Sequence, residues 1–162
     1  MNRFLLFSLV GVFSIFLGSQ ITEGVLLVPY WKSLTASSFY EYYAVFGDKI
    51  GRFYTPLTVV AVLIPLATSV YCYTKKSKAL VFALISSIFA LLVILIFYSF
   101  FKGINQQFHK ASFTEEELQT ALLTWEFYHW ARIVFEFVSL TFLGLTFAKI
   151  LKENSLTSNM NR

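Results

Sequence analysis

Cysteine and charge are the two features in which this sequence is poorest. Its single cysteine, Cys72, cannot form an internal disulfide, which excludes the membrane thiol oxidoreductases that act through paired cysteines. Only 14% of its 162 residues are charged, against about 25% in an ordinary soluble domain. The net charge is +4, but the basic residues lie in short runs between apolar segments, so the sequence does not indicate a nucleic-acid partner.

Apolar residues make up 57% of the chain and include 19 phenylalanines. They form four runs, each long enough to cross a bilayer as a helix: residues 4–31, 53–73, 79–101 and 114–153. We therefore predict an all-α bundle of four transmembrane helices, with residues 1–153 as a single membrane domain and residues 154–162 as a disordered cytoplasmic tail. The first run also fits a signal peptide that ends near residues 17–19, but the apolar character resumes at residue 24, which favours a span.

A more polar, aromatic stretch separates the first two runs. Ser38 and Glu41 have the spacing of a capping box, and Gly47 is a typical helix end. The aromatic residues between them suit the membrane–water boundary. The pattern predicts a short interfacial helix between transmembrane helices 1 and 2, and a lid over a substrate site is the alternative.

The last helix has a clear start signal. Thr114 is placed to cap it, Glu117 to complete the capping box, and Phe113 to pack on Leu118. A helix from there to Glu153 is longer than a hydrocarbon core of about 30 Å, so its first turns should project from the membrane. At the end of the third run, Gly103 could interrupt the helix before His109.

Basic residues in the loops predict the orientation of this multi-pass integral membrane protein. Asp48, Glu41 and three glutamates at 115–117 dilute the positive charge on one side. The other side collects Arg3, Lys75, Lys76, Lys78, Lys149, Lys152 and Arg162. Since cytoplasmic loops carry the excess of lysine and arginine, both termini should be cytoplasmic.

The strongest indication of a functional site is the opening part of the fourth helix. At about 100° per residue, one narrow face carries Trp125, His129, Arg132 and Glu136, with Glu126 at its edge. Charges at membrane depth are costly and usually mark function. Counting helical rise places Glu23 and Asn105 near the same level, at the extracytoplasmic end of the bundle.

Several structural explanations compete with a functional site. Arg132 and Glu136 are four residues apart and could only neutralise each other. Gln20 and Glu23 could extend to the membrane boundary, although we expect Glu23 to face the bundle interior near Arg132 or His129.

Metal and haem sites are weaker hypotheses. The Glu126-x-x-His129 spacing occurs in carboxylate-bridged metal bundles, but these need a second such motif, which the sequence lacks. A single ion held by Glu23, His129 and one more ligand stays open, as does a haem between His109 and His129. No metal ligand is assigned, and the cofactor is unknown.

A set of short motifs resembles a known family. They are Gly18-Ser19, Leu27-Val28-Pro29, the aromatic stretch, a proline near the start of helix two, Asn105-Gln106-Gln107-Phe108 and Trp125-x-x-x-His129-x-x-Arg132. Their order and spacing resemble the anthrone-oxygenase-like family of small four-helix membrane proteins, over residues 18–144. The resemblance implies that Asn105, Trp125, His129 and Arg132 are the polar motif residues. It also implies that some members oxidise polycyclic phenols with molecular oxygen; Glu23 and Glu136 lie outside the pattern.

We predict that the protein binds a small, flat, lipophilic molecule that is phenolic or quinone-like. A further prediction is that the protein oxidises this molecule. His129 would act as general base and Arg132 would stabilise an oxyanion. The residues expected to contact the ligand are Glu23, Asn105, Trp125, Glu126 and Glu136. The expected partners are the lipid bilayer, this ligand, and a further copy or another membrane subunit. A non-catalytic subunit and a metal or haem redox protein are the alternatives. A transporter is disfavoured because the inner half of the bundle is almost purely apolar and offers no polar path.

Overall fold

The computed structural model describes the backbone of residues 3–160 and the side chains of residues 3–156. Its elements, all helical, are α1 (Arg3–Thr22), η1 (Glu23–Leu27), α2 (Val28–Lys32), α3 (Ala36–Thr74), α4 (Leu80–Ile96), η2 (Phe97–Phe101), α5 (Lys102–His109) and α6 (Glu115–Met160). Because α1–η1–α2 and α4–η2–α5 each run on without a break, the described chain forms four rods. All four are long and apolar enough to cross a membrane, which confirms the predicted all-α, four-helix architecture.

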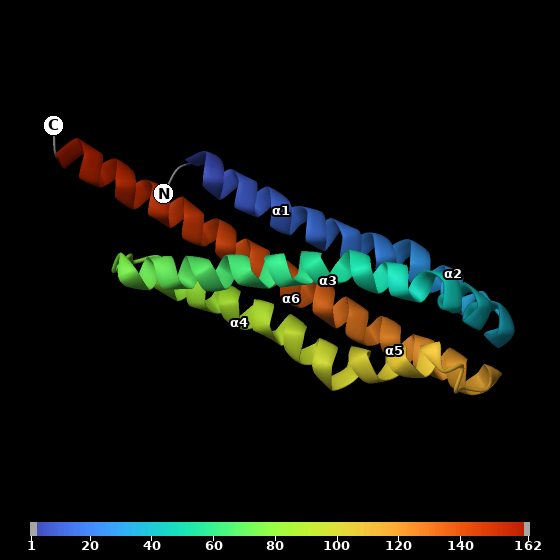
Figure 1. The fold of residues 1–162 in the computed structure, drawn as a ribbon. Helices are drawn as coiled ribbons and strands as arrows, with labels where there is room; N and C mark the ends of the chain where they lie inside the picture. Colours follow the sequence, from blue (N-terminus) through green and yellow to red (C-terminus); the bar gives the residue numbers. More distant parts are fainter. Residues whose placement is uncertain (1–2, 161–162) are drawn as a thin grey trace.

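The four rods alternate in direction (Figure 1). The two chain ends and the α3–α4 turn lie at one end of the bundle, where Glu153 accepts hydrogen bonds from the Ser77 hydroxyl (2.7 Å) and the Lys78 amide (3.0 Å). The α2–α3 and α5–α6 turns lie at the opposite end, which we call the distal end. The lysine-rich loop and the acidic start of α6 are therefore at opposite ends, and the cytoplasmic side stays a prediction.

The aromatic stretch after the first span is not a separate interfacial helix. It forms the first turns of α3, which begins after Thr35, whose hydroxyl caps the Ser38 amide at 3.3 Å. Gly47 does not end the helix: α3 continues through it to Thr74, and Gly47 keeps a negative φ. A Cβ there would lie 2.8 Å from the Tyr43 ring and 3.0 Å from the His109 ring. Gly47 thus allows close packing instead of a helix end.

The third span also runs further than the sequence indicated. Gly103 does not interrupt it, and α5 continues to His109. This span contains one π-helical segment, η2, and the first span contains another, η1, which begins at Glu23. Such π-bulges are rare and occur often at functional sites.

The predicted start of α6 is confirmed. The Glu117 carboxylate accepts the Thr114 amide at 2.9 Å, and the Glu117 amide lies 3.5 Å from the Thr114 hydroxyl. At its other end α6 is described to Met160, so the tail predicted as disordered begins inside this helix, and residues 161–162 lie outside the described residues.

Buried apolar residues form two layers. The distal layer is aromatic, with Trp31, Phe39, Tyr43, Phe101, Phe108 and Trp125, and the layer toward the termini is built around Phe13, Phe16 and Phe147. Within the second layer's half of the bundle, Ser69 and Ser87 join α3 to α4 at 2.8 Å. Ser86 likewise donates to the Ser139 carbonyl of α6 at 2.8 Å. Such hydrogen bonds hold helices together where water cannot compete.

Candidate functional site

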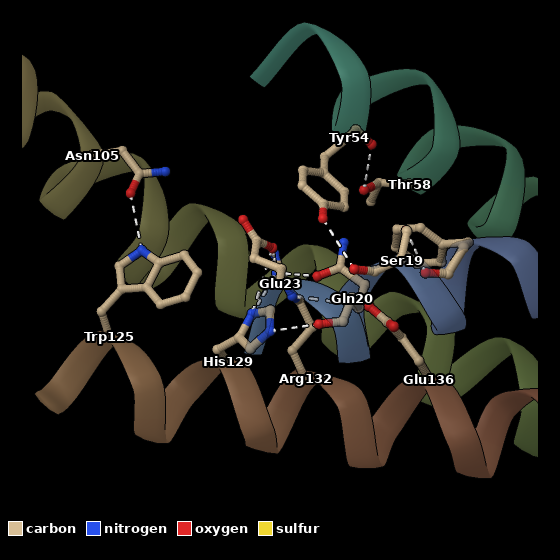
Figure 2. A network of polar contacts seen from close by, with 11 residues as sticks. Ser19, Gln20, Glu23, Tyr54, Thr58, Asn105, Trp125, His129, Arg132 and Glu136 are labelled. Carbon is tan, nitrogen blue, oxygen red and sulfur yellow. Dashed lines mark hydrogen bonds and ion pairs between the residues drawn. The ribbon is translucent and has the colours of Figure 1, made fainter. Parts of the chain in front are cut away.

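Arg132 of α6 is the centre of a buried polar cluster between α6 and the first span (Figure 2). Its Nη2 donates to Gln20 Oε1 and to His129 Nδ1 (2.8 Å), and it lies 3.4 Å from Glu23 Oε2. The guanidinium carbon also lies 4.7 Å from the centre of the Phe101 ring. A single cation thereby joins the first span, the third span and α6.

His129 is completely buried, and both of its ring nitrogens are engaged. The Arg132 guanidinium can only donate, so Nδ1 accepts, and Nε2 must carry the hydrogen that it donates to the Gln20 carbonyl at 2.9 Å. The ring stacks on Trp125 at 4.9 Å, and it approaches Gly24, where a Cβ would lie 3.0 Å away. This neutral imidazole has no free nitrogen, so its position does not support the predicted role as general base.

Glu23 faces the bundle interior, as expected from its height on the first helix. Its side chain is 3% exposed, and Oε2 lies 3.4 Å from Arg132 Nη2 and 3.8 Å from His129 Nδ1. Figure 2 shows its other oxygen pointing away from His129. The alternative in which Glu23 extends outward to the membrane boundary is wrong, and so is that alternative for the fully buried Gln20.

Glu136 lies on the opposite side of the same guanidinium. Its Oε1 is 3.9 Å from Arg132 Nε, too far for a hydrogen bond, and its side chain is 1% exposed. Among the described side chains, neither oxygen of Glu136 has a hydrogen-bond partner, and Arg132 Nε and Gln20 Nε2 also lack one. Buried polar atoms without partners are uncommon and need an explanation.

A cavity of about 690 Å³ opens next to this cluster. Its floor is buried and contains Glu23, Arg132 and the rings of Trp31, Phe101 and Trp125. Its rim is exposed and comes from α3 and the third span, including Val59, Phe97 and Tyr98. Figure 1 shows α3 and α4 close together at their shared turn and diverging toward the distal end. Because its exposed lining residues come from α3 and the third span, the cavity opens to the side of the bundle between these two rods.

Two of the motif residues line the cavity together. Trp125 Nε1 donates to Asn105 Oδ1 at 3.1 Å, which fixes both side chains. Trp31 meets the Trp125 ring edge-on at 5.3 Å, and its own Nε1 has no partner among the described residues. Sequence analysis missed Trp31, because it lies at the end of an apolar run without a charged neighbour at helical spacing.

Only some of the polar residues predicted to form the site line the cavity. Glu23, Asn105, Trp125 and Arg132 line it, whereas His129 and Glu136 lie behind them. Glu126, which the sequence predicted to contact the ligand, does not line the cavity. Its carboxylate pairs with Lys32 at 2.5 Å, away from the cavity lining, because the face of α6 that carries Glu126 meets α2.

The two histidines have different surroundings. His109 Nε2 lies 3.6 Å from Asp48 at the cavity rim, and its ring is in contact with Tyr43 at 4.8 Å. Among the described residues, no group of three or more His, Cys, Asp or Glu side chains is placed to hold a metal ion. The single-ion hypothesis on Glu23 and His129 thus lacks a third ligand of this kind.

Comparisons with protein-family models, curated proteins and solved structures found no match to this chain. The resemblance to the anthrone-oxygenase-like family therefore stays a prediction that rests on the motifs alone.

Proposed function

We propose that this protein binds a small, flat, lipophilic molecule with a phenolic or quinone-like oxygen, which it takes up from the membrane. The observation that carries the proposal is an aromatic cavity that opens to the side of the bundle and has Glu23 and Arg132 in its floor. A volume of about 690 Å³ lies within the range of about 300–1,000 Å³ typical of small-molecule sites.

The polar floor suits a neutral ligand with one oxygen. Glu23 and Arg132 already balance each other's charge at 3.4 Å, so the floor does not call for a charged partner. A ligand hydroxyl can donate to the Glu23 carboxylate, and a carbonyl oxygen can accept from the unpaired Nε1 of Trp31. The rings of Trp31, Phe101 and Trp125 offer apolar walls for a planar body.

Oxidation of the ligand is the finer proposal. It follows from the resemblance to the anthrone-oxygenase-like family, some members of which oxidise polycyclic phenols with molecular oxygen. In our proposal a phenol or an activated carbon of the ligand first loses a proton. Glu23, which lines the cavity, is better placed than His129 to take that proton, and Arg132 is placed to stabilise the resulting oxyanion. His129 then acts as a positioning residue that holds Arg132.

A non-catalytic membrane subunit is the second candidate, and one observation favours it. Arg132 Nη2 is already surrounded by Gln20, Glu23 and His129, so the cluster is able to lock α6 to the first span without any ligand. In that case the cavity would be filled by lipid, and no saturable binding would be expected.

A binding experiment separates the two candidates. Protein in lipid nanodiscs is titrated with a hydroxylated anthraquinone, and quenching of tryptophan fluorescence is recorded. We expect saturable quenching, weakened about tenfold, or about 1.4 kcal/mol, by Val59→Phe, which narrows the cavity mouth. Val60→Phe is the matched control, since Val60 is exposed on the same helix but does not line this cavity.

Two results would overturn parts of the proposal. Non-saturable quenching, or equal effects of the two variants, would contradict ligand binding in this cavity. The oxidation step is tested separately by oxygen uptake with anthrone as substrate. Saturable binding without oxygen uptake would support the ligand-binding proposal and contradict the oxygenase proposal.

A further inference from the structure

Glu136 is a member of the buried cluster that the proposed ligand-binding role leaves unused. It is 1% exposed, does not line the cavity, and has no hydrogen-bond partner among the described side chains for either oxygen. A carboxylate ion buried without a donor is very unfavourable, whereas a neutral carboxylic acid is much less so. The surroundings of Glu136 therefore favour its protonated form.

The charges in the cluster lead to the same conclusion independently. Arg132 has two carboxyl groups beside it, Glu23 at 3.4 Å from Nη2 and Glu136 at 3.9 Å from Nε. His129 adds no charge, because its two ring nitrogens are engaged as one donor and one acceptor. With both carboxyl groups ionised, the buried cluster would carry one uncompensated negative charge.

The other elements packed around the cluster do not supply a second cation. On α3, Tyr54 donates its hydroxyl to the Ser19 carbonyl at 3.0 Å. The facing residue of the first span is the neutral Gln20, which binds Arg132. The α4 segment, Leu80–Ile96, contains no ionisable side chain. The neighbouring charges Asp48, Arg52 and His109 lie at the cavity rim instead of around Glu136.

We propose that Glu23, Arg132 and Glu136 form a proton-binding site, in which one guanidinium and two carboxyl groups together hold one proton that rests on Glu136. Glu23 is then the ionised counter-ion of Arg132 and the carboxylate that faces the cavity. Loss of Glu23 would make Glu136 the counter-ion in its place, and the proton would leave.

This arrangement also has a consequence for a phenolic ligand, which rests on the proposed function. A proton that passes from the ligand hydroxyl to Glu23 leaves a ligand oxyanion beside Arg132. The oxyanion replaces the Glu23 carboxylate as counter-ion, so the buried cluster stays neutral throughout the transfer. The proton-binding site itself needs no ligand, and its test uses the protein alone.

The test is infrared spectroscopy of the protein in lipid at neutral pH, in H₂O and D₂O. We expect the wild-type protein to show the carbonyl stretch of a protonated carboxylic acid. Both Glu136→Gln and Glu23→Gln are expected to remove this band, the first because the acid is gone and the second because Glu136 ionises. Glu126→Gln is the matched control and should keep the band, because Glu126 is paired with Lys32 outside the cluster.

Two infrared results would contradict the proposal. A wild-type spectrum without the band would overturn the proposal, and so would a band that survives Glu23→Gln, since the two carboxyl groups would then not share a proton. Thermal unfolding gives a second readout. Each single variant should keep a midpoint near that of the wild type, whereas the Glu23→Gln/Glu136→Gln double variant should lose far more than the sum, because Arg132 loses both counter-ions. Additive losses would contradict the site.

Discussion

At the scale of single residues, Arg132 determines what the buried cluster can do. Its Nη2 contacts Gln20, Glu23 and His129, while the planar guanidinium lies over the Phe101 ring. The residues around it are therefore best understood by what each contributes to Arg132. Glu23 supplies charge, Gln20 and His129 supply acceptors, and only part of this assembly faces the cavity.

His129→Ala tests the positioning role of the imidazole. The variant is expected to lose about 3 kcal/mol of unfolding free energy, because Arg132 loses an acceptor and Trp125 loses its stacked neighbour. His109→Ala should lose less than about 1 kcal/mol, since its side chain is 41% exposed and its pairing with Asp48 is open to solvent. Denaturant unfolding in detergent micelles measures both, and equal large losses would instead favour the haem held by two histidines.

At the scale of elements, the cluster depends on how closely the first span approaches α6. The π-helical segment η1 begins at Glu23, and Gly24 within it leaves room for the His129 ring and for Trp130. A second π-helical segment, η2, contributes Phe101 to the floor of the cavity and Phe97 to its rim. Both irregular turns thus border the candidate site, where a regular α-helix would place these side chains differently.

Gly24→Ala tests this close approach. A Cβ at Gly24 would lie 3.0 Å from His129 and 3.2 Å from Trp130, so we expect a loss of about 1–3 kcal/mol from overpacking. Gly18→Ala is the control on the same span, because a Cβ there meets no atom within 4 Å. That substitution should be neutral or stabilise the helix by up to about 1 kcal/mol. The opposite signs can be read from thermal unfolding midpoints, and a loss at both positions would contradict the packing argument.

At the scale of the whole molecule, the bundle has two unlike ends. The termini and the α3–α4 turn share one end with Lys75, Lys76 and Lys78, and the distal end carries the aromatic layer, the polar cluster and the cavity. From the polar cluster toward the termini, the buried polar groups are serines and threonines, of which the serines join neighbouring helices and Thr68 and Thr146 bond to carbonyls of their own helices. A path for a polar solute through the bundle is therefore not apparent from the described residues.

Cysteine labelling tests this arrangement in the membrane. In a Cys72→Ala background, Ser77→Cys and Glu116→Cys are expected to react with an impermeant reagent from opposite sides of sealed vesicles, because the two positions lie at opposite ends of the bundle. The side on which Ser77→Cys reacts also tests the prediction of cytoplasmic termini. Labelling of both from one side would contradict four crossings.

Some of the candidate site could be predicted because helical geometry is local. A fixed turn of about 100° and a rise of 1.5 Å per residue place Trp125, His129, Arg132 and Glu136 on one face, and Glu23 at their height, without knowledge of any neighbour. The four spans follow equally from apolar length. Glu23 next to Arg132 is a prediction of this kind, and the structure confirms it.

The rest of the candidate site was decided by packing between helices. Such packing depends on distances between helices, which the geometry of one helix does not determine. The sequence alone could not show that Gly47 packs against His109 instead of ending a helix, or that Lys32 binds Glu126. Nor could it show that both His129 nitrogens are engaged while Trp31 lines the cavity. A polar side chain is free to bind a ligand only where its neighbours leave it unpaired, and those neighbours come from other spans.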